Sequence, residues 1–263
     1  MMSTALSSHA HWVATARGRL YAQSWTPPQP QGVPLILLHD SLGCVALWRD
    51  FPERLAQATG RQVIAYDRLG FGRSDAHPGI LPVTFVQDEP LVDLAAVVRH
   101  FGLTQFVVFG HSVGGGMAVY AAAAFPDACV GVVTESAQAF VESVTIDGIR
   151  AARDQFAQAG QMERLQKYHG SKAEWVLQAW IDTWLSEAFR PWSMDAQLPM
   201  VTCPVLCLHG DHDEYGSLQH PQRIARGVGG AVTLSILRGC GHVPHRERAD
   251  VVLSELGTFL TPA

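Results

Sequence analysis

Three segments of the chain hold residue types that together could perform nucleophilic catalysis. The first is VVFGHSVGGG, residues 107–116, in which Ser112 lies between Gly110 and Gly114. The apolar run before Ser112 and the alanine-rich run after it predict a sharp turn from a buried strand into a helix. Such a turn, a nucleophile elbow, exposes the serine hydroxyl and points helical N–H groups at any oxyanion formed there. The pentapeptide alone leaves open that Ser112 is only a small turn residue.

A nucleophilic serine also needs a base and an acid, and two later segments supply candidates. The segment HGDHDE, residues 209–214, follows one apolar run, and RGCGH, residues 238–242, follows another. The order Ser112, then an aspartate, then His242 is the order of a catalytic triad built on an open α/β sheet. We therefore expect Ser112 to be a nucleophile and His242 to be its base.

Three carboxylates compete for the place of the acid. Asp213 lies three residues past Gly210, which gives the chain room to leave the strand and return a carboxylate toward His242. Asp211 leaves the strand too early for that, and we expect it to hydrogen-bond its own loop. Glu135 ends an earlier strand and stays an alternative acid, although a structural or substrate-facing role is favoured for it. The spacing favours Asp213.

The elements that must position these segments follow from hydrophobic periodicity. Apolar runs predict strands at 34–39, 62–66, 105–109, 130–134, 204–208 and 231–237. Helical patterns lie between them, near 45–58, 88–101, 114–125, 219–227 and 246–260. Before the first of these strands, residues 11–16 and 20–25 predict a hairpin around Arg17-Gly18-Arg19. Strands that alternate with helices predict an α/β fold, in which a mostly parallel sheet is covered by helices on both faces.

The interval from 137 to 198 breaks this alternation, because it holds no convincing strand. Helical patterns occur there around 147–168 and 171–189. The second pattern begins with Ser171-Lys172-Ala173-Glu174, which has the spacing of a capping box and predicts a helix start.

A helical insertion between two strands indicates a lid over the carboxyl edge of the sheet, where α/β sheets bind ligands. We expect a core made of residues 1–136 and 199–263, with residues 137–198 as the lid. Trp180 and Trp184 lie in the lid pattern. Either they contact substrate or they only pack the lid onto the core, and both interpretations remain open.

Composition excludes several function classes. The chain has 263 residues, 48% of them hydrophobic, and a net charge of −5, with no Lys/Arg cluster of the kind that nucleic-acid binding requires. The opening MMSTALSSHAHW has neither the basic residues nor the apolar run of a signal peptide or membrane anchor, so we expect a cytoplasmic protein. Its cysteines form no C-x-x-C pair, and we expect reduced thiols and no metal: Cys44, Cys129, Cys203, Cys207 and Cys240. A monomer or a homodimer fits equally well.

With these motifs in place, the chain resembles the α/β-hydrolase superfamily over nearly its whole length. The resemblance rests on His39-Asp40-Ser41-Leu42-Gly43, on Asp67 to Ser74, on the elbow at 110–114, on Gly210-x-x-Asp213 and on Gly241-His242. The start of the lid, ESAQAFVESVTIDGIR, is similar to the biphenyl-hydrolase-like (valacyclovirase-type) group. The resemblance implies the α/β-hydrolase fold and a hydrolase that needs no cofactor.

The resemblance also implies roles. Ser112 matches the nucleophile and His242 the general base, while Asp213 matches the acid that fixes the imidazole tautomer and stabilises its protonated form. The backbone N–H groups of Val113 and Ser41 match the two donors of an oxyanion hole.

One position departs from the family pattern. Asp40 stands where the superfamily usually has glycine, which puts in doubt the conformation of residues 39–43, the oxyanion loop. We expect His39 to brace this loop and His111, beside the nucleophile, to shape the substrate pocket.

Further residues have structural interpretations. Asp67 and Arg68 are expected to pin a turn, and Cys44 has no partner that would make it a thiol nucleophile. His212, His220 and His245 are expected at the surface or in support of the site.

The leading hypothesis is a cofactor-free carboxylesterase that acts on a small ester through an acyl-enzyme on Ser112. An amide or lactone substrate, carbon–carbon bond hydrolysis and perhydrolysis are alternatives that use the same triad. A non-catalytic ligand receptor on this fold is a further alternative, but a receptor has no need of all three triad residues.

Overall fold

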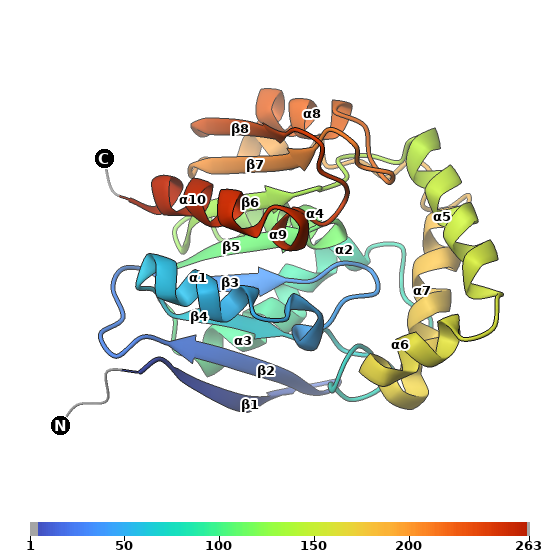
Figure 1. Ribbon diagram of the computed structural model, residues 1–263, viewed down its shortest axis with the longest axis horizontal. Helices are drawn as coiled ribbons and strands as arrows, with labels where there is room; N and C mark the ends of the chain where they lie inside the picture. The colour runs from blue at the N-terminus through green and yellow to red at the C-terminus, as the bar shows by residue number, and fades with distance from the viewer. Residues whose placement is uncertain (1–4, 262–263) are drawn as a thin grey trace.

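In the computed structural model, which describes residues 5–261, eight strands form one sheet in the order β1-β2-β4-β3-β5-β6-β7-β8 (Figure 1). The strands are β1 (Ser7–Thr15), β2 (Gly18–Thr26), β3 (Leu35–Leu38), β4 (Val63–Tyr66), β5 (Phe106–His111), β6 (Cys129–Glu135), β7 (Val205–Gly210) and β8 (Val232–Leu237). β1 and β2 form the predicted hairpin and β2 pairs antiparallel with β4, whereas the remaining neighbours are parallel. The predicted α/β fold with a mostly parallel sheet is confirmed.

Helices cover both faces because successive residues of the buried strands point to opposite sides. In β3, Leu35 and Leu37 pack into one apolar core with α1 (Phe51–Thr59) and α10 (Ala249–Leu260). Ile36 and Leu38 pack into the core on the other face. The helices of that face are α2 (Phe85–Glu89), the π-helical turn η2 (Pro90–Leu94), α3 (Ala95–His100), α4 (Val113–Ala124) and α8 (Gln219–Gly227). The short helix α9 (Pro244–Glu247) precedes α10 (Figure 1).

Three helices lie between β6 and β7, at the end toward which the parallel strands point (Figure 1). They are α5 (Ser143–Phe156), α6 (Gln161–His169) and α7 (Ala173–Leu185). Ile149 of α5 and Trp184 of α7 are buried in the same core as α4, so apolar contacts hold this insertion on the sheet edge. The short 3₁₀ turn η4 (Leu198–Met200) leads from it into β7.

Several predicted helices are interrupted in the structure, and two of the breaks occur at residues with positive φ. The pattern at 45–58 divides into the 3₁₀ turn η1 (Val45–Trp48) and α1, because Arg49 adopts a left-handed φ of 55° that no helix continues through. The pattern at 147–168 divides into α5 and α6 at Gly160, whose φ is 85°. Hydrophobic periodicity continues across such a break and does not reveal it.

The predicted capping box is wrong. Residues Gly170–Lys172 form the 3₁₀ turn η3, and α7 begins at Ala173 with no side-chain hydrogen bond at its N-cap, Lys172. The helix also ends at Leu185, four residues before the predicted end at 189. Ser171 lies within this turn and not at the N-cap of α7, so its hydroxyl is not where it could accept a free helix N–H.

Within residues 5–261 no helix combines the length and the apolar character that crossing a bilayer requires. The longest regular α-helix described, α5, has 14 residues and one polar face. The expected cytoplasmic location stays a prediction.

Candidate active site

Ser112 occupies the turn between β5 and α4 with a backbone conformation rare for any residue but glycine. Its φ and ψ are 56° and −124°, and its N–H donates to the Glu135 carbonyl at 2.8 Å. A Cβ at Gly110 would collide with the Gly114 backbone, and one at Gly114 with the Leu38 carbonyl. The turn is therefore as sharp as the flanking glycines predicted, and strain of this kind persists where the surrounding structure holds it.

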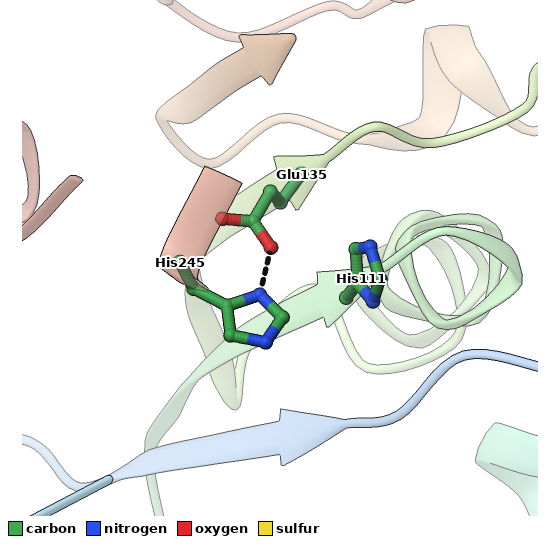
Figure 2. Close-up of side chains that lie close together, drawn as sticks. All are labelled: His111, Glu135 and His245. Atoms are coloured by element: carbon green, nitrogen blue, oxygen red, sulfur yellow. Dashed lines mark hydrogen bonds and ion pairs between the residues drawn. The ribbon is translucent and has the colours of Figure 1, made fainter. Parts of the chain in front are cut away.

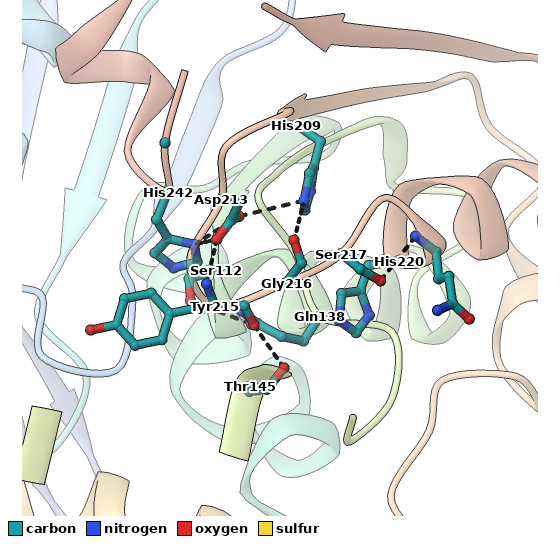
Figure 3. Close-up of polar contacts among 12 residues, drawn as sticks. Ser112, Gln138, Thr145, His209, Asp213, Tyr215, Gly216, Ser217, His220 and His242 are labelled. Carbon is teal, nitrogen blue, oxygen red and sulfur yellow. Dashed lines mark hydrogen bonds and ion pairs between the residues drawn. The ribbon is translucent and has the colours of Figure 1, made fainter. Parts of the chain in front are cut away.

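Asp213 and His242 form a hydrogen-bonded pair at the carboxyl ends of β7 and β8 (Figure 3). The His242 Nδ1–H donates to both carboxylate oxygens of Asp213, at 2.8 and 2.9 Å. Burial alone would raise the pKa of Asp213, but the hydrogen bond and charge of His242 outweigh it and lower that pKa. The carboxylate thus fixes the tautomer in which Nε2 of His242 is free to accept a proton.

The two alternative carboxylates have other partners. Asp211 accepts the Gly239 N–H at 2.6 Å, so it bonds the loop after β8 and not, as expected, its own loop. Glu135 accepts the Nδ1–H of His245 at 2.5 Å. Of the three candidate acids, Asp213 is the one that contacts His242.

Gln138 is a site residue that the sequence analysis did not single out. The Ser112 hydroxyl donates to its Oε1 at 3.3 Å, and no hydrogen bond joins Ser112 to His242 among the residues described (Figure 3). Gln138 is buried just after β6, at the sheet edge that carries the triad. Its position just after a predicted central strand is the feature of the sequence that could have indicated a site residue.

The oxyanion loop, residues 39–43, is held by many hydrogen bonds. The Asp40 carbonyl accepts from His39 Nδ1 at 2.8 Å and from an Arg68 Nη at 2.7 Å. The Asp40 side chain accepts the Leu42 N–H at 2.8 Å. The side chain that stands in place of glycine therefore stabilises its own turn, and His39 braces the loop as expected.

Ser41 of this loop lines the same cavity as Ser112, and Val113 directly follows Ser112 at the start of α4. The main-chain atoms of Ser41 and Val113 therefore lie near the nucleophile. Their role as oxyanion donors stays a prediction.

His111 lies beneath the cavity rather than in its wall, contrary to the expected pocket-shaping role. Its ring is buried, with Nδ1 3.3 Å from Asp40 Oδ2 and Nε2 2.8 Å from the His242 carbonyl oxygen. Because both ring nitrogens face protein acceptors, the side chain is turned away from the space where substrate would bind.

A cavity of about 130 Å³, partly open to solvent, lies between the sheet edge and helices α5 and α7. Trp180 and Trp184 both line it, and Trp184 also packs against the Phe189 and Trp192 rings. Tyr215, another residue the sequence analysis missed, packs against His242 with tilted rings whose centroids are 4.9 Å apart. The lining residues are Asp40, Ser41, Leu42, Ser112, Gln138, Thr145, Ile149, Trp180, Trp184, Tyr215 and His242.

The first lid helix is bonded to the loop that carries Asp213. The Thr145 hydroxyl donates to the Tyr215 carbonyl at 2.7 Å (Figure 3). Glu142 accepts the Ser217 N–H at 2.6 Å and lies 2.7 Å from buried His220. These contacts fix the lid above the acid loop.

The remaining sequence candidates have structural positions. Asp67 accepts the Val45 and Arg73 N–H groups and so pins its turn. Burial, followed by the charge of Asp67, raises the pKa of the Cys44 thiol to about 12, which disfavours a reactive thiolate. His212 is exposed.

One cluster has the residue types of a metal site: His111, Glu135 and His245, whose ligand atoms lie within 4.8 Å of one another (Figure 2). Metal binding requires a free lone pair on each imidazole. Both nitrogens of His111 face acceptors, and Nδ1 of His245 is bonded to Glu135. The donor set thus fits a hydrogen-bonded network better than a metal centre.

Comparison with known proteins agrees with the α/β-hydrolase fold. Residues 33–174, just over half of the chain, match the family model described as the alpha/beta hydrolase fold. Epoxide hydrolase B of Mycobacterium tuberculosis is 34% identical over 127 residues, 48% of this chain and 35% of that protein. The non-heme haloperoxidase of Rhodococcus erythropolis is 28% identical over 76% of this chain and 82% of that protein.

A solved structure, the 2-hydroxy-6-oxo-6-phenylhexa-2,4-dienoate hydrolase of Rhodococcus sp. strain RHA1, superposes with a TM-score of 0.74. It is 18% identical, and the match covers 97% of this chain and 99% of that one. At this identity the likeness shows the fold alone. The chain spans about a third of the length of the epoxide hydrolase it matches.

Proposed function

The chain belongs to the α/β-hydrolase fold family, and we propose that it is a serine hydrolase that cleaves small, neutral carboxylic esters without a cofactor. Ser112 attacks the ester carbonyl while His242 takes the hydroxyl proton and then gives it to the departing alkoxide. Water deprotonated by His242 next cleaves the acyl-enzyme and releases the acid. The backbone N–H groups of Ser41 and Val113 stabilise the oxyanion of both tetrahedral intermediates.

The observation that supports this proposal most is the Asp213–His242 pair beside the strained turn of Ser112 in one cavity. An ionised carboxylate on Nδ1 leaves Nε2 as the basic nitrogen, which the reaction needs. In the unliganded protein the Ser112 hydroxyl is bonded to Gln138, so substrate binding must redirect it to His242.

The cavity wall supports a neutral and mostly apolar substrate. Leu42, Ile149 and the two lid tryptophans supply apolar surface. Asp40 is the one carboxylate in the lining described, and its oxygens are already bonded to Leu42 and His111. No free charge is therefore left in this wall to select a charged substrate.

Perhydrolysis is a second candidate, and the match to a protein named non-heme haloperoxidase over most of both chains favours it. Hydrogen peroxide would replace water in the second step and leave with the acyl group as a peracid. The same triad serves both reactions.

The test is hydrolysis of p-nitrophenyl acetate and butyrate by wild type and by Ser112→Ala, with styrene oxide as a third substrate and hydrogen peroxide as an added arm. We expect ester turnover that falls by several orders of magnitude in Ser112→Ala, and fluorophosphonate labelling at Ser112 alone in the intact-protein mass. Residual activity above about a hundredth of wild type, or a label elsewhere, would contradict the assignment of the nucleophile. Turnover of styrene oxide but of neither ester would contradict the substrate class.

A further inference from the structure

Asp40 brings a carboxylate to the oxyanion loop, where a negative charge opposes the reaction. We propose that Asp40 and His111 form an ion pair that neutralises this carboxylate and holds the oxyanion loop and the His242 loop in their working arrangement. The pair consists of positioning residues for the serine hydrolase reaction proposed above, on which this inference rests. It joins two segments far apart in the sequence, the loop after β3 and the last residue of β5.

The Asp40 end of the pair shapes the oxyanion loop. One carboxylate oxygen accepts the Leu42 N–H at 2.8 Å, and the other lies 3.3 Å from Nδ1 of His111. Asp40 and Leu42 flank Ser41 in the chain, so the first contact closes a turn around Ser41, whose N–H the proposed reaction needs in the cavity. A change in the position of the Asp40 side chain therefore changes the direction of an oxyanion donor.

The His111 end reaches the catalytic base. Its Nε2 lies 2.8 Å from the carbonyl oxygen of His242, so the ring bridges Asp40 and the backbone of the base. Only an imidazolium can donate from both nitrogens at once to two such acceptors. Although burial lowers it, the hydrogen bond that His111 donates to Asp40 and the charge of Glu135 raise the pKa of His111 to about 9.

The groups around His111 explain why the charge is stable there. Asp40 faces it from the oxyanion loop and Glu135 from the end of β6, while the rings of His242 and His245 lie 5.1 and 5.0 Å away (Figure 2). Burial lowers the pKa of His245, which keeps that ring neutral. With His245 neutral, a charged His111 between the two carboxylates leaves one net negative charge beneath the oxyanion, whereas a neutral His111 would leave two.

Removal of His111 alone should harm the reaction more than removal of both partners. His111→Gln leaves an unpaired carboxylate beside the developing oxyanion, so charge repulsion adds to the lost bridge. Asp40→Asn keeps an acceptor for the Leu42 N–H and removes the charge. In Asp40→Asn/His111→Gln two amides of similar shape can bond each other with no net charge.

The first test is a double-mutant cycle on kcat/KM for p-nitrophenyl acetate. We expect a loss of about 100-fold in His111→Gln, of about tenfold in Asp40→Asn, and of about tenfold in the double variant. His212→Gln is the matched control, because it removes an exposed histidine and should stay within about twofold of wild type. A double variant whose loss equals the product of the two single losses overturns the proposal.

The second test separates this inference from the proposed function, since it needs no turnover. Nitrogen NMR of the histidine rings in wild type should show both His111 nitrogens protonated at pH 7, with the proton lost near pH 9. A neutral His111 ring at pH 7 overturns the pair even if esters are cleaved. Absence of ester turnover with a charged His111 ring overturns the proposed function instead.

A third test, the pH dependence of kcat, relates the charge of His111 to turnover. Because the pKa of His111 is raised, its charge is present at neutral pH and is lost as pH rises through about 9. Wild-type kcat should therefore fall above about pH 9, and the double variant should lack this fall. The same fall in both enzymes overturns the assignment to the pair.

Discussion

Besides the Asp40–His111 pair, two histidine–carboxylate pairs lie at the carboxyl edge of the sheet, and one of these two borders the cavity. His242 donates Nδ1–H to Asp213 at 2.8 Å, and His245, three residues later, donates Nδ1–H to Glu135 at 2.5 Å. Both carboxylates are fully buried and both follow or end a central strand. By residue type and hydrogen bonding alone, each pair could be the base and acid of a hydrolase.

The two pairs differ in what surrounds the imidazole ring on the side away from the carboxylate. His242 lines the cavity with Ser112 and lies under the Tyr215 ring. His245 packs against the rings of Trp48 and Phe51, with centroids 4.6 and 5.4 Å away, and lines none of the cavity described. The His242–Asp213 pair is therefore the catalytic candidate because substrate can reach it, and not because its hydrogen bond is stronger. The His245–Glu135 pair is part of the core.

Of the substitutions that test the difference between the two pairs, Asp213→Asn should have the largest effect on kcat. Loss of the carboxylate removes the tautomer control of His242 and the stabilisation of its charged form, so kcat should fall by about 10³ to 10⁴. Asp211→Asn is the matched control, since Asp211 lies in the same loop as Asp213 but bonds Gly239 instead of His242, and it should cost less than about tenfold. The measurement is kcat for p-nitrophenyl acetate, with circular dichroism to show that both variants are folded. Similar losses in the two variants would assign the effect to the loop rather than to the acid.

Breaking the other pair should act on stability instead. Glu135→Gln leaves a neutral partner for His245 and should lower the free energy of unfolding by about 1 to 3 kcal/mol, because a buried charge-assisted hydrogen bond is lost. Its kcat should fall by less than about tenfold. Urea unfolding and the esterase assay on the same sample check both effects. If Glu135→Gln reduces kcat more than Asp213→Asn does, the acid has been assigned to the wrong strand.

The comparison also shows how far the sequence could reach. The flanking glycines predicted the elbow at Ser112, and the distance from Gly210 favoured the carboxylate that the structure pairs with His242. Both the turn at Ser112 and the position of Asp213 are local features, because the backbone of a few neighbouring residues determines them. The α/β alternation was equally clear, since each buried strand is a continuous apolar run.

What the sequence could not provide depends on contacts between distant segments. Nothing near Asp40 in the chain indicates that His111 neutralises it, and Gln138 and Tyr215 reach the cavity only through the fold. The breaks at Arg49 and Gly160 fall within periodic apolar patterns that continue on both sides. Periodicity records which face is buried, but it does not record where the chain turns.

The smallest expected effect is that of a substitution in the cavity wall near the His242 pair. Trp180 lines the cavity and its ring lies 6.1 Å from that of Tyr215, so Trp180→Ala removes apolar surface above the His242 pair and none near the His245 pair. Trp184 is less suitable, because it is 2% exposed and its loss would also disrupt packing within the lid.

With Trp180→Ala, the KM for p-nitrophenyl butyrate should rise about three- to tenfold, which corresponds to the loss of about 1 kcal/mol of apolar contact. The KM for the acetate should change less, because its acyl group is shorter and reaches less of the lid, and kcat should stay within about twofold for both esters. Trp12→Ala is the control, since Trp12 is 44% exposed on the edge strand β1 and lines none of the cavity described. A fall in kcat with KM unchanged for both esters would show that Trp180 supports the triad rather than the substrate. In that case the lid would contribute to the geometry that distinguishes the two pairs, and not only to the space above one of them.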